Sequence, residues 1–143
     1  MATASVSERT FEDIEVGEEI PAFDVALTPQ RMVMEVGVSQ DYAPIHHDRE
    51  IAQELGAPDM FVNTLFLQGV YEAAVREWAG LAMKLVSMQF RMNTFNCAGE
   101  MLTTTGRVTD KREEDGRKLV DIEMWTETPD NGKTTNGKIV AAF

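Results

Sequence analysis

The sequence predicts an α+β protein in which a curved antiparallel sheet wraps around one long central helix. Two observations lead to this fold class. Residues 63–79 carry the longest helical pattern in the chain, with apolar side chains on most sides of the helix. After Gly80, apolar residues recur at every second position instead, which is typical of strands. The chain of 143 residues is long enough for one domain with its own core.

The segment before the long helix has room only for short elements. Residues 1–10 are small and polar and are expected to form a flexible tail. A single domain is therefore expected over residues 11–143, with a first strand over residues 22–27.

Two short helices are predicted next, from their start and stop signals. Thr28 can cap the first helix, Pro29 can occupy its first position, and the helix is expected to end near Val38. Asp48 can cap the second helix, and Gly56 can end it. The loop between these helices contains both histidines of the chain.

The long helix has an unusual distribution of apolar residues and an unfavourable glycine. Its first three turns are apolar almost all round, so other structure must cover them. Gly69 stands in the middle, where glycine is about 1 kcal/mol less favourable than alanine. This cost indicates either close packing of the helix against a sheet or simple tolerance of a poor residue.

Four strands are predicted after the helix, over residues 86–92, 101–111, 118–128 and 134–143. In the first of them, the side chains expected to face the core are Val86, Met88, Phe90 and Met92. Turn sequences at Glu113–Gly116 and Asp130–Gly132 join the later strands, so we expect a four-strand antiparallel meander. A long helix enclosed by such a sheet is a hot-dog fold, and because one sheet rarely covers the helix, we expect a paired domain.

Composition and charge exclude several classes of protein. The net charge of −11 lies in residues 1–80, since acidic and basic side chains are equal in number over residues 81–143. Nucleic-acid binding is not expected, because it requires lysine and arginine to replace counterions. Cys97 is the only cysteine, and neither a signal peptide nor an apolar run that could span a bilayer is evident. We therefore expect a cytoplasmic protein with no membrane partner.

The histidines, His46 and His47, stand side by side in one short segment. Imidazole is the side chain best suited to acid–base chemistry at neutral pH. Asp41 precedes His46 by five residues, and Pro44 disfavours a continuous helix because it lacks an amide hydrogen and restricts Ala43. A turn can aim Asp41 and His46 at one point, which makes them a candidate catalytic pair.

This segment, with the sequence Asp-Tyr-Ala-Pro-Ile-His over Asp41–His46, resembles the hydratase signature of the MaoC-like family of enoyl thioester hydratases and dehydratases. The resemblance includes the opening Phe11–Gly17, the buried helix and the strands after it. The segments His46–Asp48, Asp59–Asn63 and Trp78–Gly80 resemble most the short subunits of two-chain actinobacterial hydratases. Those subunits act on bulky acyl-CoA esters such as steroid side-chain thioesters.

The resemblance implies hydration of trans-2-enoyl-CoA to 3-hydroxyacyl-CoA, or the reverse dehydration. Asp41 and His46 would hold a water molecule, and the carboxylate would accept a proton as the water attacks C3. The thioester oxygen then needs a prepositioned donor, and the family's donor maps onto the backbone amide of Thr64. Weaker candidates for substrate binding are Asn63, Tyr42 and His47.

The same resemblance implies the partners. An acyl-CoA thioester is the expected substrate, and the chain is expected to form a homodimer or a heteromer with a second MaoC-like chain. No cofactor is expected. A metal site built from His46, His47 and Asp48 is not expected either, because adjacent side chains diverge and no further histidine completes a ligand set.

The sequence departs from the family pattern at two places. Ala43 replaces the usual asparagine, and Asn63-Thr64 replaces histidine–glycine at the start of the long helix. Two other functions stay open. One is a non-catalytic hot-dog subunit that shapes the acyl pocket of a partner chain. The other is a hot-dog acyl-CoA thioesterase, for which Glu72 would be the carboxylate inside the long helix.

Overall fold

A computed structural model describes residues 8–143, and this part has five strands and three α-helices. The strands are β1 (Glu19–Ala26), β2 (Lys84–Met92), β3 (Met101–Glu114), β4 (Arg117–Thr128) and β5 (Gly132–Ala142). The helices are α1 (Pro29–Ser39), α2 (Arg49–Glu54) and α3 (Thr64–Ala79), and single 3₁₀ turns form at Phe11–Asp13 and Pro44–His46.

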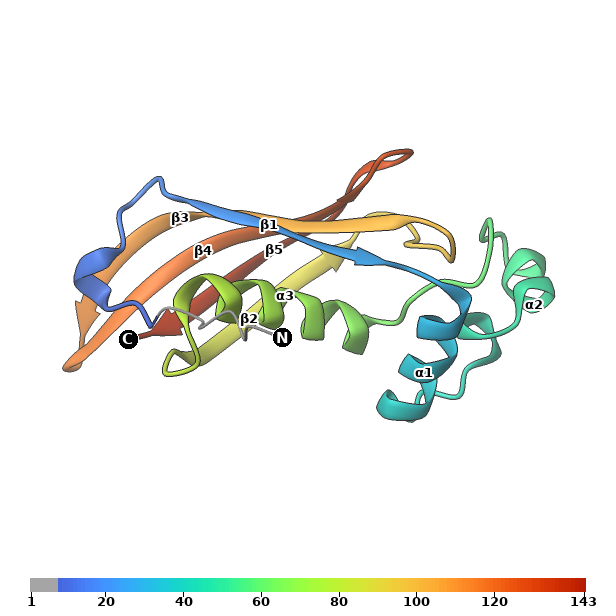
Figure 1. Cartoon of the computed structure of the whole chain (residues 1–143), viewed down its shortest axis with the longest axis horizontal. Helices are drawn as coiled ribbons and strands as arrows, with labels where there is room; N and C mark the ends of the chain where they lie inside the picture. The colour runs from blue at the N-terminus through green and yellow to red at the C-terminus, as the bar shows by residue number, and fades with distance from the viewer. Residues whose placement is uncertain (1–7) are drawn as a thin grey trace, which may run out of the picture.

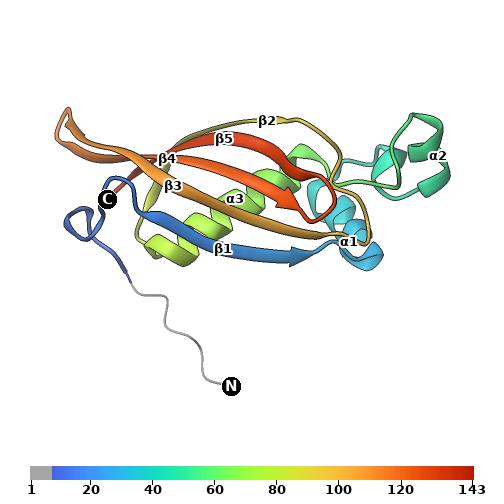
Figure 2. The same cartoon turned by 90° about the horizontal axis from the view of Figure 1, so that it is seen from above.

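The strands form one antiparallel sheet that curves around α3, and α1 and α2 lie beyond the N-terminal end of α3 (Figure 1). Seen from above, α3 runs along the sheet, with β1 at one edge and β2 at the other (Figure 2). This arrangement confirms the predicted α+β hot-dog fold. Within residues 8–143, no helix is long and apolar enough to cross a membrane.

The core lies between one face of α3 and the concave face of the sheet. The residues that α3 buries are Leu67, Val70, Tyr71, Ala74, Val75, Trp78 and Ala79. They pack against apolar side chains of β4 and β5 such as Ile122, Met124 and Ile139. Tyr71 is fully buried and hydrogen-bonds to the hydroxyl of Thr135 at 2.6 Å, and its burial raises the pKa of Tyr71 to about 12.

Local signals placed the short helices correctly. The hydroxyl of Thr28 accepts a hydrogen bond from the amide of Arg31, as expected for the cap of α1. The carboxylate of Asp48 caps α2 in the same way, and Gly56 follows α2 with a φ of +89°. Asn63 caps α3 with its side-chain oxygen.

The strand order, β1-β3-β4-β5-β2, shows that the predicted four-strand meander is wrong in one respect. β3, β4 and β5 do follow one another as antiparallel neighbours, but β2 pairs with β5 and not with β3. The reason is the connection after β2. Residues 93–100 do not join β2 to β3 as a hairpin, and this segment instead makes an antiparallel bridge between Cys97 and Phe61 on its way to β3.

The alternation predicted for β2 is also wrong at its start. The pairing of β2 with β5 shifts register between Leu85 and Ser87, so Val86 occupies a β-bulge and is 42% exposed. Leu85 packs against the core in place of Val86, whereas Met88 and Phe90 face the core as predicted. A bulge inserts one residue, and this reverses the facing of every residue before it.

Gly69 does not serve close packing. A Cβ atom added to it would meet no atom within 4 Å, and the residue is exposed. The close-packing interpretation of Gly69 is therefore wrong. Leu65, one turn earlier, is 49% exposed, so the apolar surface of α3 is only partly covered within this chain.

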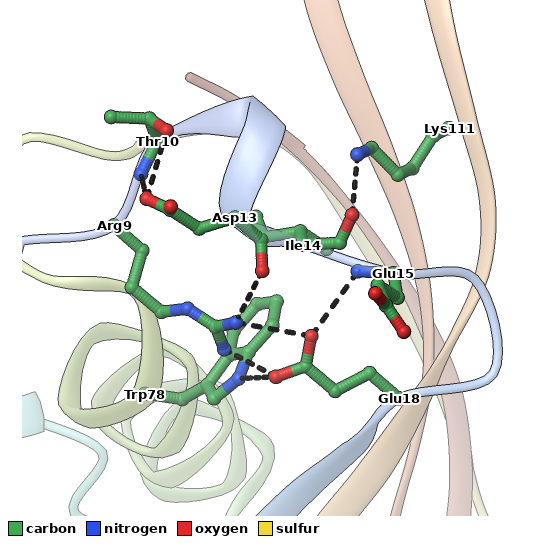
Figure 3. Close-up of polar contacts among 8 residues, drawn as sticks. All are labelled: Arg9, Thr10, Asp13, Ile14, Glu15, Glu18, Trp78 and Lys111. Carbon is green, nitrogen blue, oxygen red and sulfur yellow. Dashed lines mark hydrogen bonds and ion pairs between the residues drawn. The ribbon is translucent and has the colours of Figure 1, made fainter.

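A cluster of polar groups closes the C-terminal end of α3 (Figure 3). Arg9 donates to the carboxylate of Glu18 and lies 4.8 Å over the Trp78 ring, and Trp78 donates to the same carboxylate at 3.0 Å. Burial alone would raise the pKa of Glu18, but the bonds from Arg9 and Trp78 outweigh it and leave this pKa below its usual value. Of the tail predicted over residues 1–10, residues 1–7 lie outside the described part, and Arg9 also donates its backbone amide to Ala79.

Candidate active site

The loop between α1 and α2 brings Asp41 and His46 together. α1 ends at Gln40, whose left-handed conformation (φ 59°) turns the chain back on itself. Asp41 then accepts a hydrogen bond from the amide of Ala43, and the 3₁₀ turn that starts at Pro44 carries His46 inward. As a result, Asp41 Oδ2 lies 3.3 Å from His46 Nε2.

A second contact fixes the orientation of the His46 ring. His46 Nδ1 lies 2.7 Å from the backbone oxygen of Phe61. A carbonyl oxygen can only accept, so Nδ1 carries a hydrogen, and Nε2 is the ring nitrogen that faces Asp41. The ring is also 6% exposed and meets the Phe61 ring edge-on at 5.3 Å, so its orientation is fixed.

Asp41 is held from the other side by Asn63. Asn63 Nδ2 donates to Asp41 Oδ2 at 3.0 Å and to the hydroxyl of Ser39 at 3.2 Å. Its Oδ1 accepts from the amide of Phe66 at 2.9 Å, which is the cap of α3. Asn63, which is 4% exposed, therefore both caps α3 and holds the carboxylate of Asp41 in position. It supplies the brace that the asparagine replaced by Ala43 could have given.

The start of α3 presents a free donor beside this pair. The first amides of a helix have no partner within the helix. The backbone N–H of Thr64 hydrogen-bonds to no group in residues 8–143 and lies at the positive end of the helix dipole. Because Asn63 directly precedes Thr64 and hydrogen-bonds to Asp41, this donor lies next to the Asp41–His46 pair.

The weaker candidates differ in position. Tyr42 is 66% exposed, and His47 is exposed on the same loop, so both side chains face solvent. Asn63 lies inside the site, as described above. In the part of the chain that the structure describes, no group of three or more histidine, cysteine, aspartate or glutamate side chains is placed to hold a metal ion.

Two hollows flank the first turn of α3. The larger, with a volume of about 780 Å³, is a mainly apolar groove between α1, β1 and α3. Ser39 and Leu65 line the part of it nearest to the Asp41–His46 pair, called the dyad below. The smaller, of about 460 Å³, lies on the other side, between Thr64 and Gln68 of α3 and residues 88–92 of β2. The site thus opens toward both edges of the sheet.

Some of this site could not be read from the sequence. The carbonyl of Phe61 sets the orientation of the His46 ring, yet backbone groups carry no signal in a residue pattern. Only the fold shows that the hydroxyl of Ser39 accepts from both Asp41 and Asn63. Asparagine is a favoured residue at the start of a helix, but only the fold shows that Asn63 also binds Asp41.

Comparison with known proteins identifies the family. A family model described as a MaoC like domain matches residues 13–128, which include the dyad loop, α3 and most of the sheet. The chain belongs to the MaoC-like family. It is also 31% identical over 94 residues to the 3-oxo-4,17-pregnadiene-20-carboxyl-CoA hydratase beta subunit of Mycobacterium tuberculosis, a match that covers 66% of this chain and 73% of that protein.

Solved MaoC-like structures agree with this fold. A chain of the ChsH1-ChsH2 complex from M. tuberculosis superposes with a TM-score of 0.81 at 26% identity, covering 90% of this chain and 98% of that one. The (R)-hydratase from A. caviae involved in PHA biosynthesis superposes with a TM-score of 0.82 at 16% identity, covering 91% and 97%. The second likeness concerns the fold alone.

Proposed function

We propose that this MaoC-like protein hydrates trans-2-enoyl-CoA thioesters to 3-hydroxyacyl-CoA, or catalyses the reverse dehydration. The observation that carries the proposal is the pairing of Asp41 Oδ2 and His46 Nε2 at 3.3 Å, with the Nδ1 hydrogen of His46 committed to a carbonyl. A carboxylate and, in the neutral ring, an imidazole lone pair then face the same small space. A water molecule has two O–H groups, so one water can donate to both.

The reaction follows from this arrangement. Asp41 accepts a proton as the oxygen of the bound water attacks C3 of the enoyl group. Negative charge develops on the thioester oxygen, and the N–H of Thr64 donates to it at the positive end of α3. The proton then passes from the same pair to C2, so that H and OH have added across the double bond. Dehydration follows these steps in reverse.

A thioesterase reaction has weaker support. It would need a free carboxylate on or beside the central helix, and of the two glutamates of α3, Glu72 lies well inside the helix and Glu77 lies near its end. The guanidinium of Arg76 holds Glu72 at 2.7 Å, one turn further along the helix. The carboxylate is therefore already paired, whereas Asp41 faces the site.

We further propose that a second MaoC-like chain completes the site. β2 is an edge strand of nine residues without proline, and within residues 8–143 no strand pairs with its outer side. Such an edge is a template for another strand. The related M. tuberculosis protein is a beta subunit, and the ChsH1-ChsH2 structure is a complex of two chains. By the same relation we propose a bulky acyl-CoA, of the steroid side-chain type, as substrate, and the cytoplasm as location.

A spectrophotometric assay tests the hydratase proposal. The absorbance of the conjugated enoyl thioester is expected to fall when the protein, with any chain that copurifies, is added. Asp41→Asn and His46→Ala are each expected to lower kcat by about 10²- to 10⁴-fold, the usual contribution of a positioned acid or base. Glu54→Gln, at an exposed carboxylate of α2, is the matched control. Wild-type rates in both dyad variants would contradict the assignment.

The second candidate function is a non-catalytic subunit that shapes the pocket of a partner hydratase. The observation that favours it is the open edge of β2, together with the two-chain relative. The same assay separates the two functions. If the complex is active and stays active with Asp41→Asn in this chain, then the partner carries the chemistry.

A further inference from the structure

The two residues of the dyad are held in different ways. The ring of His46 is buried, and its Nδ1 atom lies 2.7 Å from the backbone oxygen of Phe61. The side chain of Asp41 is 37% exposed, so packing alone does not fix it. Its carboxylate accepts from the amide of Ala43 at 3.4 Å, a long hydrogen bond, and from Asn63 Nδ2 at 3.0 Å. The position of the Asp41 carboxylate therefore depends mainly on Asn63.

The amide group of Asn63 can be oriented in only one way. Its Oδ1 atom accepts from the amide of Phe66 at 2.9 Å, so Nδ2 faces the other way, and Nδ2 carries two hydrogens. One hydrogen is donated to Asp41 Oδ2, and the other is donated to the hydroxyl oxygen of Ser39 at 3.2 Å. Asn63 is 4% exposed, so water cannot readily replace either acceptor. Without the hydroxyl of Ser39, one buried hydrogen would lack an acceptor, and the amide would be free to turn away from Asp41.

Ser39 also binds the backbone of Asp41. Its hydroxyl oxygen accepts from the amide of Asp41 at 3.3 Å, which closes a turn over Gln40. Gln40 has a φ of 59°, in the left-handed region, which is unfavourable for a residue with a side chain. Within residues 8–143, the other non-glycine residue with a positive φ is Asp115, in the hairpin turn between β3 and β4. The strained turn at Gln40 instead leads into the dyad, and strain of this kind is common at functional sites.

We propose that Ser39 is a positioning residue for the hydratase reaction. Its oxygen accepts one hydrogen bond from the backbone of Asp41 and one from Asn63, so it fixes both the backbone of the aspartate and the amide that holds its carboxylate. Ser39 thereby keeps Asp41 within reach of the water that attacks C3, and a displacement of about 1 Å can lower a rate by about 10²-fold. This inference rests on the proposed hydratase function and deepens it by adding a residue of α1 that acts through the dyad.

Kinetics with crotonyl-CoA or trans-2-octenoyl-CoA, whichever the purified complex hydrates faster, test the proposal. Ser39→Ala is expected to lower kcat by about 10- to 10²-fold and to change KM by less than about twofold, because the carboxylate is misplaced while the substrate contacts remain. Ser39→Thr and Ser39→Val give side chains of the same shape, and only threonine keeps the hydroxyl. Ser39→Thr is expected to retain at least about a third of the wild-type kcat, whereas Ser39→Val is expected to lose as much as Ser39→Ala.

Thr28→Ala is the control for a loss of helix stability. The hydroxyl of Thr28 caps the other end of α1 by accepting from the amide of Arg31 at 3.2 Å. Its removal is expected to lower the melting temperature at least as much as Ser39→Ala does, because loss of a cap destabilises a helix. The kcat of Thr28→Ala is expected to stay within about twofold of the wild-type value, since this hydroxyl shares no partner with the dyad or with Asn63.

The double variant Ser39→Ala/Asn63→Ser shows whether the two residues act on the same carboxylate. Substitutions that act through one group have effects that do not add. Asn63→Ser alone releases the carboxylate of Asp41, so the addition of Ser39→Ala is expected to lower kcat by less than about threefold further. Independent effects on kcat would multiply instead.

The outcomes are separable. A wild-type kcat in Ser39→Ala, equal kcat values in Ser39→Thr and Ser39→Val, or a loss of kcat in Thr28→Ala as large as that in Ser39→Ala would overturn this inference and leave the hydratase function intact. Multiplied losses in the double variant would do the same. Failure of the wild-type complex to hydrate either thioester would overturn the proposed function, and the inference with it.

Discussion

The two ends of α3 are built in opposite ways. At the C-terminal end, the carboxylate of Glu18 accepts hydrogen bonds from Arg9, from Trp78 and from the amide of Glu15. Both of its oxygens are therefore paired inside the protein (Figure 3). At the N-terminal end, the backbone N–H of Thr64 has no hydrogen-bond partner within the described residues. The first amides of a helix have no partner in the helix and are free to bind another group. The paired end contributes to the stability of the fold, and we propose that the unpaired end binds the substrate thioester.

Substitution of Asn63 is expected to have the largest effect, because this residue both caps α3 and holds Asp41. Serine is also a good cap but is too short to reach Asp41 as well. Asn63→Ser is therefore expected to keep the melting temperature near that of the wild type while lowering kcat by about 10²-fold, because the carboxylate loses its fixed position. Asn63→Ala is expected to lose the same activity and a further ~1 kcal/mol of stability.

Thermal unfolding and steady-state kinetics of the two variants separate these effects. If Asn63→Ser kept full activity, the bond from Asn63 to Asp41 would have no catalytic role. If Asn63→Ser lost as much stability as Asn63→Ala, the cap and the brace could not be separated at this residue.

Substitutions at the C-terminal end of α3 are expected to change the stability of the protein but not its activity. Glu18→Gln removes the charge that Arg9 and Trp78 bind, and this should lower the free energy of unfolding at pH 7 by about 1–3 kcal/mol without changing kcat. The folded-state pKa of Glu18 lies below its ordinary value of 4.5. Its contribution is therefore present above pH 4.5 and is lost as the pH falls through the lower, folded-state value.

Denaturant titrations of wild type and Glu18→Gln over this pH range provide the measurement. The two stabilities should differ at neutral pH and converge in acid. A constant difference at all pH values would mean that the ion pair is not its source. Glu15→Gln, on the same segment, is a control, since the structure shows no hydrogen bond to the Glu15 carboxylate from another residue in its described part.

The sequence could predict the features that depend on neighbouring residues but not those that depend on distant ones. Helix caps, the period of apolar residues and the Asp41–His46 spacing are local signals, and the structure places those elements and that pair as the signals indicated. The position of β2 beside β5 depends on a long connection, and the bulge at Val86 depends on pairing with a distant strand. Neither can be read from neighbouring residues.

Gly69 shows the limit most clearly. The sequence revealed its cost to the helix but not its surroundings, and close packing was the natural interpretation. Only the fold shows that the position is open and faces the groove. Similarly, the sequence around Glu35 is typical of a solvated charge. Only the packing of α1 on the rest of the protein shows that one oxygen of Glu35 is buried without a hydrogen-bond partner in the described residues.

The smallest expected effect compares two glycines on open helix faces. Gly69→Ala and Gly37→Ala should each raise the free energy of unfolding by about 0.5–1 kcal/mol, because alanine is the better helix former and neither added methyl group meets an atom within 4 Å. Only Gly69 lines the groove, so only Gly69→Ala should lower kcat/KM for a long enoyl-CoA, and by no more than a few-fold for one methyl group. Equal stabilisation with unequal kinetics would mean that Gly69 is retained for the ligand at the expense of the helix. Equal kinetics would instead make Gly69 a tolerated poor residue, the simpler alternative that its sequence context allowed.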